Sequence, residues 1–171
     1  MYTEELFVKR VVFLLIIIAG AVSFAVACAR SDEVITTPVT IYYVDAEINR
    51  LLPYDDEIPD ADTEHMAAAA VEKLIEGRDD NDKIRRLIPK DKDCISTRTD
   101  GNTVYVDLSS KITEDLPFSR DIEKLLIYQI VDTLTSLKGV RFVRFTVDGE
   151  VRKDFMGYYD MRETYKFVYP E

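Results

Sequence analysis

The sequence has few of the residues that build disulfide frameworks, zinc sites and nucleophilic active sites. It contains two cysteines, Cys28 and Cys94, and one histidine, His65, in 171 residues. Cys94 is left alone if Cys28 is used elsewhere, so no disulfide framework is expected. One cysteine and one histidine cannot complete a zinc site, and Ser109-Ser110 lacks the Gly-x-Ser-x-Gly elbow of a hydrolase. We therefore expect no enzyme activity, metal or cofactor, and interpret Cys94 as a small buried apolar residue.

Positive charge is also scarce. Lysine and arginine number 22 against 32 aspartate and glutamate residues, which gives a formal net charge of -10 at pH 7. Nucleic-acid binding depends on neutralising phosphates, so this composition excludes nucleic acid as an expected partner. The chain is long enough for one domain of ordinary size beyond its N-terminal segment.

One long apolar run stands at the N-terminus. Residues 11–27 follow Lys9 and Arg10 and lead directly into Cys28, and charge returns at Arg30. Basic residues, an apolar stretch and small residues in this order are typical of an export signal. The basic residues indicate that the chain beyond the run lies outside the cytoplasm.

Two kinds of membrane anchor fit residues 1–28. Ala25-Val26-Ala27-Cys28 resembles a bacterial lipobox, in which Cys28 is acylated and the preceding signal peptide is removed. The apolar run is also long enough for an uncut transmembrane helix, which needs about 20 residues. Both alternatives predict a protein on the extracytoplasmic face of the cell membrane, with residues 29–38 as a tether.

Hydrophobic periodicity predicts alternating strands and helices after the tether. Residues 39–44 are β-branched and aromatic and predict a strand. Residues 51–58 predict at most a short edge strand or an extended loop, because Pro53 and Pro59 interrupt the pattern. Apolar residues at helical spacing predict two helices, and alternating residues predict further strands. The helices are expected at 63–76 and 120–138, closed by Gly77 and Gly139, and the strands at 94–98, 103–108, 140–147 and 164–169.

This order of elements predicts a single small α+β domain. The pattern β-(β)-α-β-β-α-β-(β) favours an α/β-like mixed sheet with both helices on one face. Asp100-Gly101 between two alternating runs indicates a hairpin.

Three segments of this domain resemble the GerMN domain, a bacterial sporulation and spore germination domain also found in envelope lipoproteins. They are LIYQIVDTLT at 126–135, DGNTVYVDLSS at 100–110 and VRFTVDG at 143–149. The usual helix pattern is Gln-Ile-Val-Asn-Thr-Leu, so Asp132 stands where asparagine is common. The resemblance covers residues 39–151. It leaves a C-terminal aromatic extension, residues 152–171, which we expect to pack on the domain.

The resemblance implies a fold similar to the ring-building motifs of envelope assemblies. It also implies a non-enzymatic interaction and assembly module with protein partners in an envelope complex, in sporulation or spore germination. The alternative is a lipoprotein that binds a cell-wall or small polar ligand.

Tyr42, Tyr105 and Phe142 occupy strand positions that alternate with the expected core residues. A sheet covered by helices on one face leaves its other face open. We therefore predict these three aromatic residues as a candidate interaction surface. In the alternative interpretation, the aromatic C-terminal extension folds back and covers them.

Overall fold

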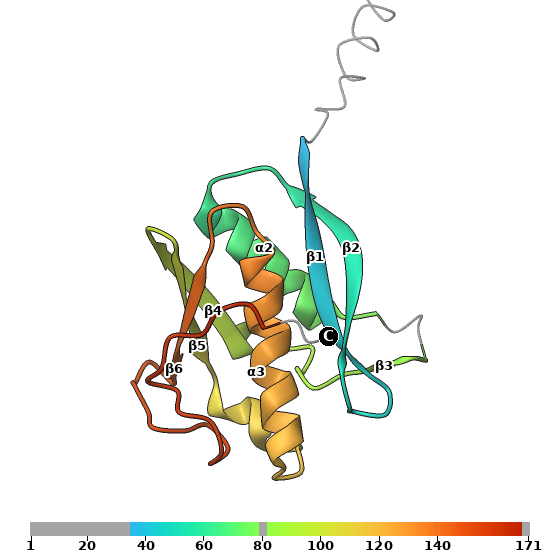
Figure 1. The fold of residues 1–171 in the computed structure, drawn as a ribbon, viewed down its shortest axis with the longest axis vertical. Coiled ribbons are helices and arrows are strands. Elements are labelled where there is room, and N and C mark those ends of the chain that lie inside the picture. The colour runs from blue at the N-terminus through green and yellow to red at the C-terminus, as the bar shows by residue number, and fades with distance from the viewer. Residues whose placement is uncertain (1–34, 79–81, 169–171) are drawn as a thin grey trace, which may run out of the picture. The chain divides into compact units, whose positions relative to one another are not determined.

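The computed structural model describes residues 35–78 and 82–168 (Figure 1). The predicted anchor, including Cys28, lies outside the described residues. Within the described part, no helix is both long and apolar enough to cross a membrane. The elements are β1 Thr36–Asp45, β2 Leu51–Pro59, α2 Thr63–Glu76, β3 Ile84–Arg85, η1 Lys92–Cys94, β4 Ile95–Asp100, β5 Thr103–Leu108, η2 Ser110–Thr113, α3 Arg120–Thr135 and β6 Phe142–Val147.

The strands form two sheets of three strands each in the described part of the chain, with orders β2-β1-β3 and β4-β5-β6. All neighbours are antiparallel except β5 and β6, which are parallel. The two helices lie between the sheets: α3 packs against β1 and β6, and α2 against β1 and β4 (Figure 1). The α+β class is confirmed, but the expected single sheet with both helices on one face is wrong.

The second edge of β1 explains why the sheets remain separate. That edge pairs with β3 only at Val44 and Asp45. Elsewhere along this edge of β1, the Tyr42 N–H donates to Thr133 Oγ1 at 2.9 Å. Ser136 Oγ donates to the Thr40 carbonyl at 3.1 Å. Because hydroxyl groups from the end of α3 satisfy these backbone groups, this edge needs no strand from the other sheet.

Both helices form where the periodicity predicts them, but the second ends early. For α2, Asp62 accepts a hydrogen bond from the His65 N–H at 3.0 Å, and the Gly77 N–H donates to the Lys73 carbonyl at 3.0 Å. Gly77 has a φ of 62°, which glycine adopts readily. The predicted end of α3 at residue 138 is wrong. The helix ends at Thr135, and beyond it the backbone tightens, because the Leu137 N–H donates to the Leu134 carbonyl three residues back at 3.2 Å.

Several predicted strand limits change, including those of β4, which spans 95–100 instead of 94–98, and of β6, which spans 142–147 instead of 140–147. Strand β1 begins at Thr36, inside the predicted tether, and β2 is nine residues long instead of short. An edge strand tolerates Pro53 because only one of its sides must pair. The predicted final strand does not form over its described residues, 164–168: Tyr165 forms an isolated bridge with Val143, and the Val168 N–H binds a side chain of α3.

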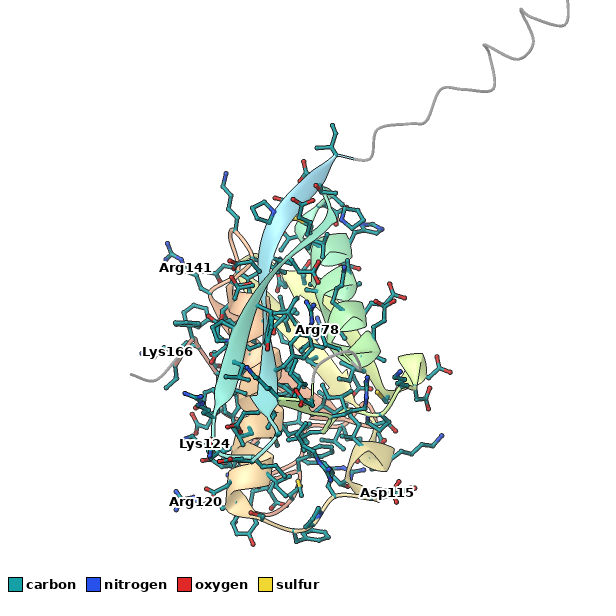
Figure 2. The ribbon with its side chains drawn as sticks, turned by 90° about the vertical axis from the view of Figure 1, so that its right-hand side faces the viewer. Arg78, Asp115, Arg120, Lys124, Arg141 and Lys166 are labelled. Atoms are coloured by element: carbon teal, nitrogen blue, oxygen red, sulfur yellow. The ribbon has the colours of Figure 1, made fainter. Side chains whose placement is uncertain are left out.

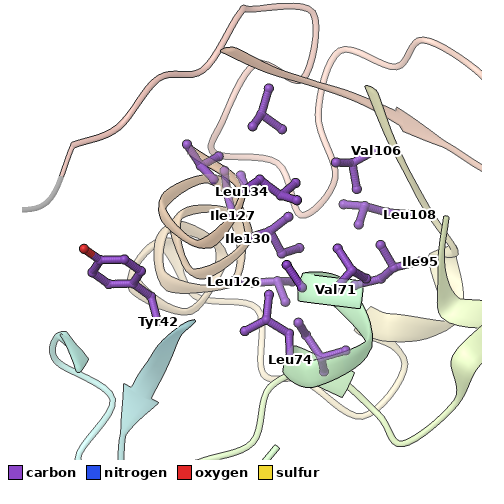
Figure 3. Close-up of a cluster of buried hydrophobic side chains, with 14 of the residues drawn as sticks. Tyr42, Val71, Leu74, Ile95, Val106, Leu108, Leu126, Ile127, Ile130 and Leu134 are labelled. Carbon is purple, nitrogen blue, oxygen red and sulfur yellow. The ribbon is translucent and has the colours of Figure 1, made fainter. Parts of the chain in front are cut away.

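Apolar residues of α3 fill the space toward β5 and β6 (Figure 3). Leu126, Ile130 and Leu134 are fully buried, as the helical spacing predicts. Val106 and Leu108 face them from β5 (Figure 3). Cys94 is also buried, and burial raises the pKa of its thiol to about 11. The interpretation of Cys94 as a core residue is therefore confirmed.

Candidate functional site

The structure does not bring the three predicted surface aromatics together. Tyr42 belongs to β1, whereas Tyr105 and Phe142 belong to the other sheet. Tyr42 is only 7% exposed, and the ring of Phe167 meets it edge-on with 6.0 Å between centroids. The extension therefore covers Tyr42, as the alternative interpretation has it. The premise of one shared aromatic face is wrong because there are two sheets.

The β4-β5-β6 sheet has an apolar inner face and a polar outer face. Inward residues such as Val104, Val106 and Phe145 are buried. Strand register places the alternate residues in cross-strand rows on the side turned away from the helices. We call these residues the outer face: Ser96, Arg98, Asp100, Thr103, Tyr105, Asp107, Phe142, Arg144 and Thr146.

The central row of the outer face places tyrosine between two arginines. Arg98 pairs in register with Tyr105, and Tyr105 with Arg144. The Arg98 guanidinium carbon lies 3.9 Å from the centroid of the Tyr105 ring, which is a cation–π contact. This row concentrates positive charge on a chain whose formal net charge is -10.

The next row gives the outer face a polar hollow. Asp107 Oδ1 accepts hydrogen bonds from Thr146 Oγ1 at 2.6 Å and from the Gly149 N–H at 2.8 Å. That carboxylate oxygen is therefore held by its own sheet and the following turn. A hollow of about 410 Å³ extends from Asp107 and Thr146 to Arg98 and Tyr105.

A second polar region lies between α3 and the C-terminal extension. Glu123 is fully buried, and its two carboxylate oxygens accept hydrogen bonds from the backbone N–H groups of Met156 at 2.9 Å and Tyr158 at 2.8 Å. A carboxylate thus satisfies two donors of a segment that has no strand partner there. The sequence signal for this contact is a glutamate among apolar residues of α3.

Asp132 makes the corresponding contact two and a half turns further along α3. It is fully buried, and Oδ1 accepts a hydrogen bond from the Val168 N–H at 3.2 Å. Oδ2 is buried and has no hydrogen-bond partner among the residues that the structure describes. Burial raises the pKa of this carboxyl to about 6, and the hydrogen bond from Val168 partly opposes the shift.

Asp132 lines a cavity of about 170 Å³, which we call the Asp132 pocket. Tyr128 and Tyr159 form part of its wall, with ring centroids 6.4 Å apart and ring planes at 84°. Arg50 and Lys124 also line it. Reasoning from sequence identified Asp132 only as a departure from the usual asparagine and missed the pocket.

The residues weighed for catalysis or metal binding lie apart. His65 is exposed in the first turn of α2 and contacts Asp62, whereas Cys94 is buried before β4. The Ser109 hydroxyl accepts a hydrogen bond from the Lys111 N–H at 3.4 Å, at the start of η2. Across residues 35–78 and 82–168, no three histidine, cysteine or acidic side chains gather in a way that could hold a metal ion.

Known proteins share both sequence and fold features with this chain. The family model Germane, described as sporulation and spore germination, matches residues 40–153. A structure of the tandem GerMN domains of the sporulation protein GerM from Bacillus subtilis is 17% identical with a TM-score of 0.56, covering 78% of this chain and 46% of that one. The first GerMN domain of the same protein is 18% identical with a TM-score of 0.52, covering 74% and 93%.

A candidate lipoprotein from Clostridium perfringens is also similar. It is 16% identical with a TM-score of 0.51, covering 80% of this chain and 91% of that one. No curated protein matches the sequence. At these identities the structural matches establish a common fold of two helices and two sheets.

Proposed function

The chain belongs to the Germane family of sporulation and spore germination domains, and we propose that it is a membrane-anchored interaction module of the cell envelope. In this proposal it has no catalytic role and binds an acidic surface of a partner protein through the outer face. The family description names a developmental process and no reaction.

The central row of the outer face is the observation that carries this proposal. Arginine and tyrosine are enriched among the residues that dominate binding energy at protein interfaces. Two guanidinium groups beside one ring suit carboxylates, which accept paired hydrogen bonds from arginine. Arg98 and Arg144 provide this chemistry on either side of Tyr105. An acidic partner protein therefore fits this face better than a neutral or basic one.

Charge reversal in intact cells tests the proposed surface. Cells producing the full chain would be treated with a crosslinker, and the crosslinked partners recovered and quantified. We expect the double variant Arg98→Glu, Arg144→Glu to recover about ten-fold less partner, because each change replaces attraction by repulsion. Arg120→Glu, an exposed change at the start of α3, is the matched control and should leave recovery unchanged (Figure 2).

Equal recovery from the charge-reversed and parent chains would refute the proposed surface. If purified peptidoglycan retained the chain and no protein partner were recovered, the alternative of a cell-wall-binding lipoprotein would replace the interaction module. Sedimentation of the purified chain would show whether the acidic partner is a second copy.

The envelope location is a separate part of the proposal. It rests on Lys9, Arg10, the apolar run and Cys28 in the sequence, and the similar protein from Clostridium perfringens is described as a candidate lipoprotein. If Cys28 is acylated, Cys28→Ala should abolish labelling by a fatty-acid analogue and block removal of the signal peptide. A parent chain that keeps its full length and takes up no label would instead identify residues 1–28 as an uncut transmembrane anchor.

A further inference from the structure

The buried carboxylate of Asp132 is only half satisfied. A carboxylate can accept about four hydrogen bonds, and from the residues that the structure describes Asp132 receives one, at Oδ1 from the Val168 N–H. Buried polar atoms usually have partners, so the lone Oδ2 requires an explanation. An ionised carboxylate is best satisfied by a positively charged donor.

The Asp132 pocket has room for such a donor and for more than water. Its volume of about 170 Å³ is well above the ~10–15 Å³ that one water requires. It is below the roughly 300–1,000 Å³ of pockets for drug-sized ligands. The volume therefore favours a small organic molecule and excludes a nucleotide or an oligosaccharide.

The walls of the pocket suit an alkylammonium group. Tyr128 on α3 and Tyr159 on the C-terminal extension both line the cavity, and their rings contact each other edge to face. Ring faces attract ammonium groups, and the attraction strengthens where water is excluded. Leu51 and Leu125 form an apolar part of the pocket wall, against which methylene groups of a ligand can pack.

The positive charge of Lys124 at the pocket favours a ligand that carries a negative charge at its other end. Lys124, Tyr128 and Asp132 are spaced by four residues and so share one face of α3, about 6 Å apart per step along the axis. Lys124 therefore lies two steps from Asp132, toward the N-terminal end of the helix. Arg50 lines the pocket from the segment between β1 and β2, but its Nε lies 3.7 Å from Asp45 Oδ2, with which it forms an ion pair, so Lys124 carries the positive charge that a ligand meets. A purely cationic ligand would be repelled there, whereas a carboxylate would be attracted.

We infer that the Asp132 pocket binds a small zwitterion whose ammonium and carboxylate groups are separated by several methylenes. The ammonium group donates to Asp132 Oδ2, the methylenes lie beside Tyr128 and Tyr159, and the carboxylate points toward Lys124. This inference goes beyond the proposed function, because the outer face belongs to a sheet on the other side of α3.

Calorimetric titration of the full chain in detergent micelles with 5-aminopentanoate tests the inference. Pentylamine lacks the carboxylate and pentanoate lacks the ammonium group, so both should bind more weakly. We expect saturable binding of 5-aminopentanoate, with pentanoate the weakest of the three. Heat that does not saturate, or pentanoate that binds as tightly as 5-aminopentanoate, would overturn the inference.

Asp132→Asn tests the proposed contact with little risk to the fold, because its amide oxygen can still accept from the Val168 N–H. This variant should bind 5-aminopentanoate at least about ten-fold more weakly, since it loses the charge-assisted hydrogen bond. Asp115→Asn, an exposed change in the loop before α3, should bind like the parent (Figure 2).

Lys124→Gln tests the other end of the ligand. It should weaken binding of 5-aminopentanoate while leaving pentylamine unaffected or bound more tightly. The inference fails if Asp132→Asn binds as well as the parent, or if Lys124→Gln weakens pentylamine as much as 5-aminopentanoate. Melting curves of each variant would show that the comparison is made on folded protein.

Discussion

The β4-β5-β6 sheet and the C-terminal extension both pack on α3, but by different chemistry. The sheet pairs its own backbone groups, so its inner face presents mainly apolar side chains, such as Val106 and Phe145, to the helices. The extension has no continuous strand partner, and its N–H groups need acceptors. Helix α3 supplies these acceptors through two buried carboxylates, Glu123 and Asp132.

This difference affects how each contact responds to change. An apolar contact loses stability in proportion to the volume removed, whatever the pH. A contact through buried carboxylates depends on hydrogen-bond partners and protonation. We therefore expect the sheet side of α3 to determine most of the folding stability, and the extension side to respond to polar substitutions and pH.

The largest expected effect is on the sheet side of α3. Ile130 is fully buried, and Ile130→Ala should lower the free energy of unfolding by roughly 2–5 kcal/mol, because it leaves a cavity in close-packed surroundings. Denaturant titration measures the change. Ile35→Ala is the control, since Ile35 is 72% exposed and should change stability by less than about 0.5 kcal/mol. Similar midpoints for the two variants would show that the register assigned to α3 is wrong.

The next effect is on the extension side. Glu123→Ala leaves the buried N–H group of Met156 and the partly buried N–H group of Tyr158 without their acceptors, so it should cost about 2 kcal/mol. Hydrogen exchange should show that these two amides lose protection while those of β5 keep theirs. Glu123→Gln retains one acceptor oxygen and should lose less. If protection falls equally in β5 and the extension, the two regions unfold as one unit and the comparison fails.

Asp132 should make stability depend on pH. Its folded pKa of about 6 lies above the ordinary aspartate value of 3.8, so the folded state holds this proton more tightly than the unfolded state. The contribution of the Asp132 carboxyl to the free energy of unfolding is therefore most favourable at low pH, and it is lost as pH rises from about 4 to 6. Asp132→Asn removes the buried charge, so it should be more stable than the parent by up to about 3 kcal/mol at pH 7, and the two should differ much less near pH 4. Denaturant titrations at both pH values measure this, and a difference that does not vary with pH would contradict it.

Elements with local signals could be predicted from the sequence. Helix α2 has its predicted limits because Asp62 caps its N-terminus and Gly77 caps its C-terminus. Asp100-Gly101 likewise marks the turn of the β4–β5 hairpin. The two-sheet arrangement could not be predicted, because it depends on hydroxyl groups of α3 that meet β1 across more than 90 residues, such as Thr133 with Tyr42.

The polar regions were predicted only in part. Tyr105 and Phe142 were placed correctly on the side of their strands that alternates with the core, because strand periodicity is local. The Asp132 pocket forms where the C-terminal extension packs on α3, and no local sequence pattern specifies that packing position. Glutamate and aspartate within an apolar helical stripe were the available signal, since buried acids require partners.

The smallest expected effect on stability comes from the outer face. Replacing one tyrosine by alanine in each of the two sheets tests this. Tyr105→Ala removes a half-exposed ring and its contact with Arg98, so it should lower the free energy of unfolding by only about 0.5–1 kcal/mol. Tyr42→Ala removes a buried ring that Phe167 covers, and it should cost several-fold more. In crosslinking, only Tyr105→Ala should reduce partner recovery beyond what its lost stability explains. Equal destabilisation by the two variants would show that the outer face contributes to folding rather than to binding.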